Sequence, residues 1–303
     1  MEESQRNLDA KLRRRFREIK PNATESSIRV YAAGMRRLYK ISADLNYHDI
    51  ANYVRLMSAT KARSILTPLI VFEGRERFGR LYDGVIKEAQ QQEGSQRFSE
   101  AELANWTNSR AINAGITRSK FDVDRLNLLK PRKLPVSYFR KLVQYVTLKI
   151  YKEFHWRSDL PTVLLGHNAG KNHYVNDMFY FSKFKTAKAF ARKNMLPLTF
   201  QPSKSLASLL KKYIAVRDAQ GFDNEYMIVN KKGKPFTSSA FNQFMSDTTF
   251  KYVGKRLGTS QLRKIYVTEH LLSNPTLWQK RQMARDMMQT KLETHEGYAR
   301  FHK

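Results

Sequence analysis

The sequence contains no cysteine, few acidic residues and no long apolar run. The lack of cysteine excludes disulfides, thiolate metal sites and cysteine nucleophiles. No stretch of about 18 consecutive apolar residues is present, so the sequence predicts no membrane-spanning helix. The first twenty residues, MEESQRNLDAKLRRRFREIK, lack the apolar segment of a secretory signal peptide.

The acidic residues are outnumbered by basic ones along the whole chain. There are 27 Asp and Glu against 55 Lys and Arg, which gives a formal net charge of +28. A positive field of this size favours a polyanionic partner, most simply nucleic acid. The alternative is a basic protein without such a partner, but the excess is spread over both halves and is not confined to a tail. With 41% hydrophobic residues in 303, the chain has enough apolar material for a packed core and enough length for two domains.

The first third of the sequence predicts a small helical unit. A basic helix is expected over residues 6–20, before Pro21. Ile28, Tyr31, Met35 and Leu38 then follow at helical spacing, with Ser26 or Ser27 as the expected N-cap. Further helices are expected over residues 47–57, from about residue 61, and over 77–91. The polar stretch 90–100 marks a boundary.

The rest of the sequence predicts helices around one small sheet. A strong helix begins near Ser137. Two short strands, at 178–184 and 195–200, form a hairpin with a basic connection. Four more helices are expected over residues 203–219, 237–252, 260–272 and 276–290. The expected fold class is therefore mainly α with a small β-hairpin, an α+β fold.

Four residues combine into one kind of chemistry. Arg157 and Arg263 are suited to clamp a phosphate through planar, permanently charged guanidiniums, which offset the charge of a pentacoordinate transition state. Lys185 is suited to protonate a leaving alkoxide. Tyr298 is suited to attack phosphorus. For any one of these residues alone, an ordinary surface position, or a frayed tail for Tyr298, is the simpler interpretation.

In order and with their flanks, these residues resemble the motifs of the tyrosine recombinases, also called phage-type integrases. WRSDLPTVLL resembles the first arginine box, and KFKTAKAFARKNMLPLTF resembles the hairpin with the catalytic lysine. GTSQLRKIYVTEHL resembles the second arginine box, and MMQTKLETHEGYARF resembles the segment that ends at the nucleophile. SSIRVYAAGMRRL resembles part of the helical core-binding domain. The likeness covers most of residues 24–303 and is nearest to the divergent versions carried by mobile elements and large DNA viruses.

Two positions depart from the family pattern. Ser260 stands where the second box has a histidine, and Gln289 stands where the third box has histidine or tryptophan. Gln289 and, more weakly, Ser260 still offer a hydrogen bond to phosphate, but neither is a base near neutral pH. His295, one helical turn before Tyr298, is a candidate substitute for the missing imidazole. Reduced or lost activity is the alternative that these departures leave open.

The resemblance implies a domain plan. It gives a basic N-terminal helix or arm at 1–22, a helical DNA-binding domain at 23–95, a connecting region at 96–136 and a catalytic domain at 137–303. Asp159 is expected to orient Arg157. The basic residues expected to contact DNA are Arg29, Arg36, Arg37, Lys61, Arg63, Lys183 and Lys188. Lys183 is also the alternative to Lys185, because both would lie on one face of the strand.

The resemblance also implies a function and its partners. It implies a site-specific recombinase or integrase that cuts double-stranded DNA through a 3′-phosphotyrosine, without metal, ATP or other cofactor, in a homo-tetramer on DNA and as monomer or dimer when free. The expected place is inside a cell, with DNA. The alternatives are a type IB topoisomerase-like enzyme and a catalytically inactive DNA-binding descendant. Only ARFHK follows Tyr298, so a tetramer would have to link its protomers without a long terminal extension.

Overall fold

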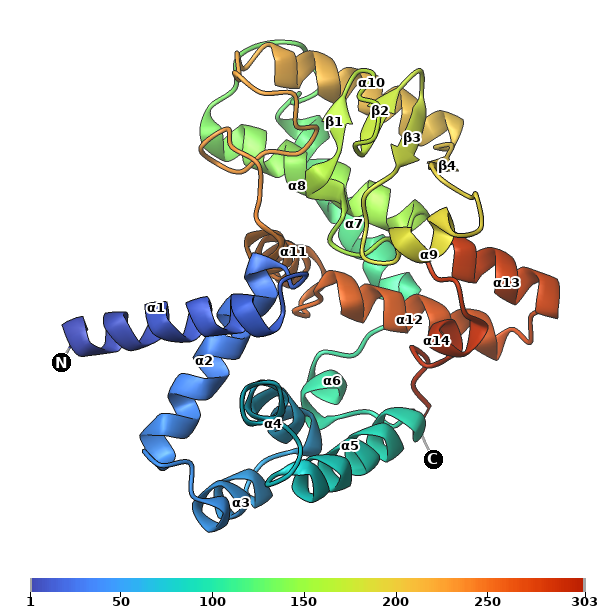
Figure 1. The fold of residues 1–303 in the computed structure, drawn as a ribbon. Coiled ribbons are helices and arrows are strands. Elements are labelled where there is room, and N and C mark those ends of the chain that lie inside the picture. The colour runs from blue at the N-terminus through green and yellow to red at the C-terminus, as the bar shows by residue number, and fades with distance from the viewer. Residues whose placement is uncertain (1, 302–303) are drawn as a thin grey trace. The chain divides into compact units, whose positions relative to one another are not determined.

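The computed structural model describes residues 2–301, and the chain divides into two compact units, residues 1–95 and 96–303 (Figure 1). Each unit has a hydrophobic core of its own. None of the helices within residues 2–301 is both long and apolar enough to cross a membrane.

Residues 2–95, the described part of the first unit, contain five helices. Their bounds are α1 Glu2–Ile19, α2 Glu25–Ile41, α3 Tyr47–Arg55, α4 Ala59–Glu73 and α5 Gly79–Gly94. The predicted stripe on α2 is largely core, since Ile28, Met35 and Leu38 are fully buried. Phe16 of α1 packs on Tyr31 and Phe72, with ring centroids 5.4 and 5.6 Å apart, so α1 is part of this core.

Two local features fix how α2 begins and how it packs. The prediction of Ser26 or Ser27 as its N-cap is wrong: the cap is Thr24, whose side chain accepts a hydrogen bond from the backbone N–H of Ser27 at 3.2 Å. Gly34 lets α2 approach α4 closely, because a Cβ at this position would lie 2.6 Å from Cγ of Pro68.

The second unit contains nine helices and four strands among its described residues. The helices are α6 Glu100–Ala104, α7 Ser109–Arg125, α8 Val136–Glu153, α9 Ala187–Ala191, α10 Lys204–Asp218, α11 Ser238–Val253, α12 Thr259–Leu272, α13 Leu277–Asp286 and α14 Leu292–Glu296. The strands are β1 Leu164–Leu165, β2 His173–Val175, β3 Met178–Phe181 and β4 Leu198–Phe200. A short 3₁₀ helix, Leu160–Thr162, precedes β1.

The strands form one mixed sheet in the order β1-β2-β3-β4. β1 and β2 are parallel, and the other two pairs are antiparallel. The predicted hairpin is the β3–β4 pair, but β3 ends at Phe181 and not at residue 184. Lys183 and Lys185 therefore lie in the turn after the strand, and the expectation that they share a strand face is wrong.

The sheet packs on an aromatic cluster that leads directly to Arg157. Trp156 is fully buried and stacks on Phe154, with centroids 4.6 Å apart and planes 1° apart. Phe179, Phe181 and Phe200 of the sheet meet its ring from 4.6 to 5.2 Å. These contacts fix the backbone beside Arg157 within the main core.

α7 lies in the region expected to be a connection, and it packs against α8 and α11. Gly115 allows the close approach to α11, because a Cβ there would lie 2.6 Å from Val253 Cγ2. Arg118 Nε donates to the carbonyl of Tyr252 at 2.8 Å. Residues 109–125 are therefore a packed layer of the second unit.

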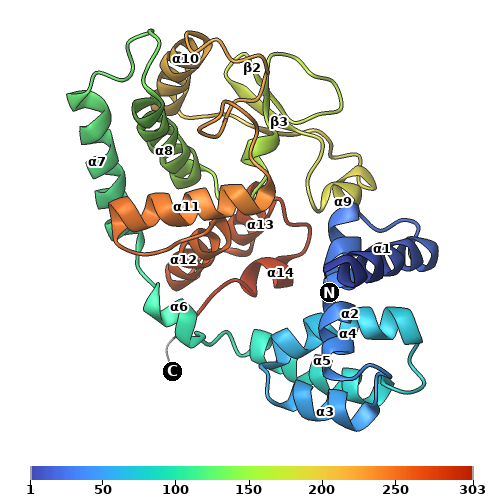
Figure 2. The same cartoon turned by 90° about the vertical axis from the view of Figure 1, so that its left-hand side faces the viewer.

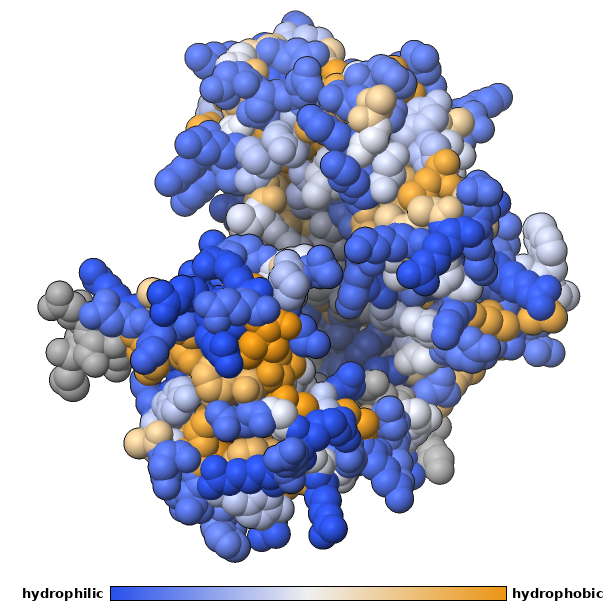
Figure 3. Space-filling model, in the orientation of Figure 1, coloured by the Kyte–Doolittle hydropathy of each residue, from blue (hydrophilic) through white to orange (hydrophobic). Residues whose placement is uncertain are grey.

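The structure confirms the expected fold class, a mostly helical α+β fold with one small sheet. The helices α12, α13 and α14 lie together beside the sheet-bearing part of the second unit in both ribbon views (Figures 1 and 2). In the view of Figure 3 hydrophilic residues cover most of the surface, as the excess of basic residues leads one to expect.

Candidate active site

Arg157 follows α8 by four residues and is held through its backbone and its neighbours. The hydroxyl of Tyr151, on the last turns of α8, donates to the Arg157 carbonyl. The next residue, Ser158, hydrogen-bonds to Asn242 of α11 at 3.1 Å and to Thr259 of α12 at 3.2 Å. Three helices thus position one arginine, while its guanidinium stays partly accessible.

Arg263 is built into the interior of α12. Its side chain is only 1% exposed, and Nη2 donates to the carbonyl of Met287 at 2.9 Å. Nε and Nη1 have no acceptor among the described residues. Burial lowers the pKa of Arg263 to about 10; attraction to Tyr298 opposes this shift, and repulsion from Arg157 adds to it. The group is therefore charged at neutral pH and has unused donors.

Tyr298 lies between these two arginines. Its hydroxyl oxygen accepts a hydrogen bond from Arg157 Nη2 at 3.1 Å. The guanidinium carbon of Arg263 lies 4.9 Å from the centre of the tyrosine ring, in cation–π range. Residues from three distant segments therefore meet at one tyrosine side chain, Arg157 at its oxygen and Arg263 at its ring. Neither composition nor spacing establishes this arrangement by itself.

The side chain of Gln289 bridges the guanidiniums of Arg157 and Arg263. It is 4% exposed. The amide orientation that satisfies its surroundings places Oε1 at 2.9 Å from Arg157 Nη2 and 2.8 Å from Arg263 Nη2. In this arrangement Gln289 accepts from the guanidiniums, whereas the sequence suggested a donor to phosphate. These two hydrogen bonds hold the guanidiniums of Arg157 and Arg263 beside Tyr298.

The segment that carries Tyr298 is tied down on both sides of the tyrosine. Before it, the carbonyl of Glu296 accepts from Gln96 Nε2 at 2.6 Å. After it, the Arg300 N–H donates to Thr268 Oγ1 at 2.9 Å, and the Phe301 N–H donates to the carbonyl of Gln96 at 3.1 Å. The described part of the terminal segment is therefore not frayed. His302 and Lys303 lie outside the described residues.

A shared carboxylate reinforces this anchor. Glu102 of α6 pairs with Lys264 of α12 and with Arg300, whose Nε is 3.4 Å from Oε2. Burial opposes ionisation, but the bonds from Lys264 and from the Ser99 N–H outweigh it and lower the pKa of Glu102 to about 2. The carboxylate is therefore charged at any physiological pH. We name Gln96, Glu102, Lys264, Thr268 and Arg300 the tail clamp.

Lys185 occupies a different setting, in the turn between β3 and α9. Its side chain is exposed and makes no hydrogen bond or ion pair with any of residues 2–301. The ends of the turn are fixed. Asn172 accepts from the backbone N–H of Lys183 at 2.8 Å, and Thr186 Oγ1 donates to the carbonyl of Met288 at 2.6 Å. The second bond places the turn beside Gln289.

The two candidate substitutes for the family histidines differ in accessibility. Ser260 is exposed on the first turn of α12, and its hydroxyl makes no hydrogen bond within the described residues. His295 is fully buried, and both ring nitrogens lack a partner there. Burial, with the nearby His270 and Arg263, lowers its pKa to about 4. A neutral imidazole with so low a pKa is a weak base at neutral pH.

Asp159 and the histidines at 155, 167 and 173 are the other titratable groups that the sequence singles out in this region. Burial raises the pKa of Asp159 to about 6 against the pull of Arg157 and Arg263, and one carboxylate oxygen has no partner within residues 2–301. His155 stacks on Tyr266 with centroids 3.3 Å apart, and His167 lies 5.3 Å from His173. No group of three or more His, Cys, Asp or Glu side chains in the described chain is arranged to hold a metal ion.

The expected DNA-contacting residues divide between the two units. Arg29, Arg37, Lys61 and Arg63 are exposed on α2 and α4, and Arg36 pairs with Asp9 at 3.3 Å. Lys183 and Lys188 are exposed beside Lys185 in the second unit. Contacts between these residues and DNA stay predictions.

Neither the tail clamp nor the network around Arg157 is predicted from the sequence. Ser99 and Glu102 fit a capping-box pattern, and the box is present. That pattern does not reveal that the same carboxylate pairs with Arg300. Ser158, Asn242 and Thr259 carry no motif at all, because their contact depends on tertiary packing.

Comparison with known proteins gives a fold but no sequence relative. No protein-family model and no curated protein matches the chain. The XerH site-specific recombinase, bound to a palindromic difH substrate in a post-cleavage complex, superposes with a TM-score of 0.56 at 14% identity, over 96% of this chain and 80% of that one. The fold of this chain is therefore similar to that of this recombinase.

A second complex of XerH shows the same relationship. A pre-cleavage complex of XerH with difH gives a TM-score of 0.50 at 16% identity, over 96% of this chain and 81% of that chain. The XerA recombinase gives 0.46 at 13% identity, over 97% and 94%. At these identities the likeness concerns the fold of this chain, and its chemistry has to be argued from its own residues.

Proposed function

We propose that this protein cuts and rejoins DNA strands through a covalent 3′-phosphotyrosine on Tyr298, as a site-specific recombinase. One observation carries the proposal. The phenolic oxygen of Tyr298 accepts from Arg157 while Arg263 covers its ring and Gln289 bridges the two guanidiniums. This cluster is suited to hold a phosphodiester beside an oxygen nucleophile.

The strand-cleavage step follows from this placement. The two guanidiniums bind the non-bridging oxygens and offset the negative charge that grows on them in the transition state. The Tyr298 oxygen attacks phosphorus as its proton passes to solvent water. The bond from phosphorus to the 5′ oxygen breaks, and Lys185 donates a proton to that oxygen. The products are a 3′-phosphotyrosine and a free 5′-hydroxyl.

The rejoining step is the same reaction in reverse. A 5′-hydroxyl attacks the phosphotyrosine, and Tyr298 leaves. Because one phosphodiester replaces another, the step needs no external energy source. Attack by the 5′-hydroxyl of a second duplex gives recombination, and attack by the original one gives resealing of the type IB topoisomerase kind.

The net charge of +28 supports duplex DNA as the partner. The exposed arginines and lysines of α2 and α4 would contact phosphates from the first unit, and Lys183 and Lys188 from the second. Assembly of a tetramer on two DNA sites, action on mobile or viral DNA, and a place inside the cell with DNA belong to the same proposal.

Covalent trapping tests the proposal directly. The probe is a randomised pool of duplexes, each with a nick close to the cleavage position, so that the short cut fragment diffuses away and rejoining fails. We expect a protein–DNA adduct that survives denaturation and is lost in Tyr298→Phe, while DNA binding by that variant persists. Intact binding without any adduct from the unchanged protein would instead indicate an inactive DNA-binding protein, the outcome that Ser260 and Gln289 favour.

A second readout separates the two enzymatic alternatives. Duplexes recovered from the trapped adduct, now without nicks, are mixed as two labelled species. Joining of one label to the other indicates a recombinase. Relaxation of supercoiled DNA that carries the same site, with no exchange of labels, indicates a topoisomerase-like enzyme.

A further inference from the structure

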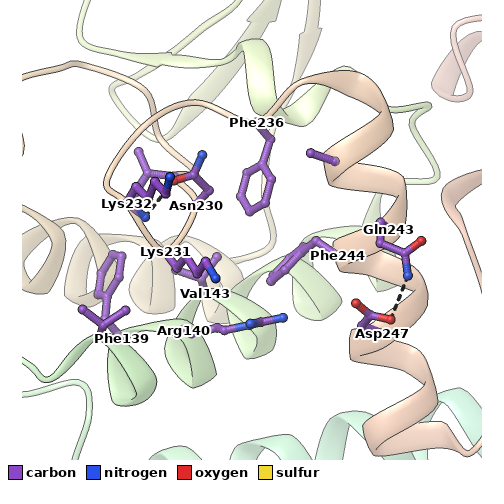
Figure 4. Close-up of a pocket in the computed structure, with 13 residues that line it drawn as sticks. Phe139, Arg140, Val143, Asn230, Lys231, Lys232, Phe236, Gln243, Phe244 and Asp247 are labelled. Atoms are coloured by element: carbon purple, nitrogen blue, oxygen red, sulfur yellow. Dashed lines mark hydrogen bonds between the residues drawn. The ribbon is translucent and has the colours of Figure 1, made fainter.

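A cavity of about 450 Å³ lies in the second unit between α8, the turn at 229–236 and α11 (Figure 4). Its walls are mostly apolar and aromatic side chains: Phe139, Val143, Val229, Phe236 and Phe244. The rings of Phe236 and Phe244 approach one another at 5.0 Å. Cavities of about 300–1,000 Å³ with such walls are typical of small-molecule sites.

The rim of this cavity is cationic. Arg140, Lys231 and Lys232 line it, and all are exposed and without an ion-pair partner in the described chain. The one carboxylate on the rim, Asp247, is already engaged by Arg256 at 3.1 Å and by Gln243 at 2.9 Å. An entering ligand therefore meets three uncommitted positive charges above an apolar floor.

The cavity is distinct from the candidate active site, although one helix touches both. Asn242 of α11 accepts from Thr259 and Ser158 in the network beside Arg157. Its neighbours Ala240, Gln243 and Phe244 line the cavity. The cavity is not lined by any of the cluster residues, which are Arg157, Arg263, Gln289 and Tyr298. The proposed strand cleavage therefore does not use this cavity.

We propose that this cavity binds a small amphipathic anion, a carboxylate or sulfonate with an apolar body. The apolar walls would take the body of the ligand, and the cationic rim would take its acidic head. The charge pattern argues against a neutral or cationic apolar ligand, because the first would leave the rim unused and the second would be repelled. The proposal does not depend on the strand-cleaving function.

The test uses anilinonaphthalene sulfonate as a fluorescent probe on the full chain, with decanoate as competitor. Decanol and decylammonium are matched competitors that keep the apolar body and change only the head. We expect decanoate to displace the probe at concentrations about tenfold lower than either of them, a difference of about 1.4 kcal/mol.

Three variants locate the binding. Ala240→Trp fills the mouth of the cavity and should abolish displaceable probe binding. The pair Lys231→Glu and Lys232→Glu should weaken decanoate about tenfold. The pair Lys204→Glu and Lys212→Glu, on exposed positions of α10 away from the cavity, changes the net charge equally and should leave binding as it was. Circular dichroism melting confirms that each variant is folded.

Other outcomes would overturn the proposal. Equal displacement by decanol and decanoate would indicate adsorption to any apolar surface. Undiminished binding in folded Ala240→Trp, or equal loss in both charge-reversed pairs, would place the probe elsewhere. Absence of decanoate binding combined with weaker duplex binding by the Lys231 and Lys232 pair would assign the rim to DNA contact.

Discussion

The candidate active site has two parts that are built in opposite ways. The arginine–tyrosine cluster is packed: Arg263 is 1% exposed, and Gln289 is 4% exposed. Lys185, in contrast, is exposed at the tip of a turn and touches no other charged group within residues 2–301. The groups proposed to bind the phosphate are thus preorganised without DNA, whereas the proposed proton donor would be placed by DNA itself.

The largest effect is expected from breaking the packed part. Arg263→Ala removes a buried guanidinium from the transition state and leaves Gln289 with one arginine. Loss of one such donor costs about 100- to 1,000-fold in rate, so we expect strand cleavage to fall by about 1,000-fold. The measurement is the rate of covalent adduct formation on the nicked duplex, with the DNA binding constant measured in parallel.

Arg217 offers the matched control for that change. It is also buried, at 4% exposure, and donates to the carbonyl of Tyr226 at 2.8 Å, away from the cluster. Arg217→Ala should lower the melting temperature without a specific loss of cleavage at temperatures where the protein is folded. If both variants lose cleavage in proportion to stability, the role of Arg263 in chemistry is contradicted.

A smaller effect is expected in the exposed part. Lys185→Ala should slow cleavage by about 100-fold, the contribution of a general acid, while Lys183→Ala should have little effect. A substrate with sulfur at the bridging 5′ position leaves without needing a proton. We expect this substrate to restore the Lys185→Ala rate, which a lysine that only binds phosphate would not show. If the sulfur substrate restored the rate of Lys183→Ala and not that of Lys185→Ala, Lys183 would be the general acid.

The sequence predicts the residues of the candidate active site but not their contacts. Arg157, Arg263, Lys185 and Tyr298 stand out by their residue type and order, because phosphoryl chemistry needs those groups. Their contacts could not be foreseen, since the hydrogen bond from Arg157 to Tyr298 joins positions 141 residues apart. An amphipathic helix such as α2 is predictable because its apolar residues recur at helical spacing, which is a local pattern in the sequence. The same apolar face packs against the core of the first unit.

The missed elements share a physical cause. α7 is polar overall, and its buried residues include only two larger apolar ones, Ile116 and Val123; it packs on α8 and α11. β1 has two residues and β2 has three, too few for a periodic pattern. The tail clamp depends on Glu102, whose capping role is local and whose pairing with Arg300 is not.

Loosening the tail clamp should have an intermediate effect. Glu102→Gln removes the charge that holds Lys264 and Arg300, so Tyr298 is held less firmly against Arg157. We expect cleavage to slow about tenfold with unchanged DNA affinity, and faster trypsin cleavage within residues 291–301. Glu100→Gln, an exposed neighbour on α6, is the control. Unchanged cleavage with faster proteolysis would show that the clamp only stabilises the fold.

The smallest effect concerns stability and pH. The pKa of His295 is about 4 in the folded protein and ordinarily near 6.5, so the unfolded chain binds more protons between these values. Its contribution to stability is present above pH 6.5 and is lost as the pH falls toward 4, by up to about 2 kcal/mol at pH 5.

His295→Leu isolates this contribution. Because neither ring nitrogen has a partner in the described chain, the variant should match the parent within about 1 kcal/mol at pH 7 and exceed it at pH 5. Urea unfolding at both pH values measures the difference. If the difference in unfolding free energy between variant and parent were the same at pH 5 and pH 7, His295 would not be held neutral in the folded protein. A selective loss of cleavage by the variant at pH 7 would indicate that His295 is a catalytic base.

The most direct test of the central claim is to identify the atom that links protein to DNA. The trapped adduct is digested with protease and nuclease and analysed by mass spectrometry. We predict a nucleotide joined through its 3′ phosphate to Tyr298, in the peptide that ends at Arg300. An adduct on another residue, a 5′ linkage, or nicked duplexes that are bound without any adduct would contradict the account.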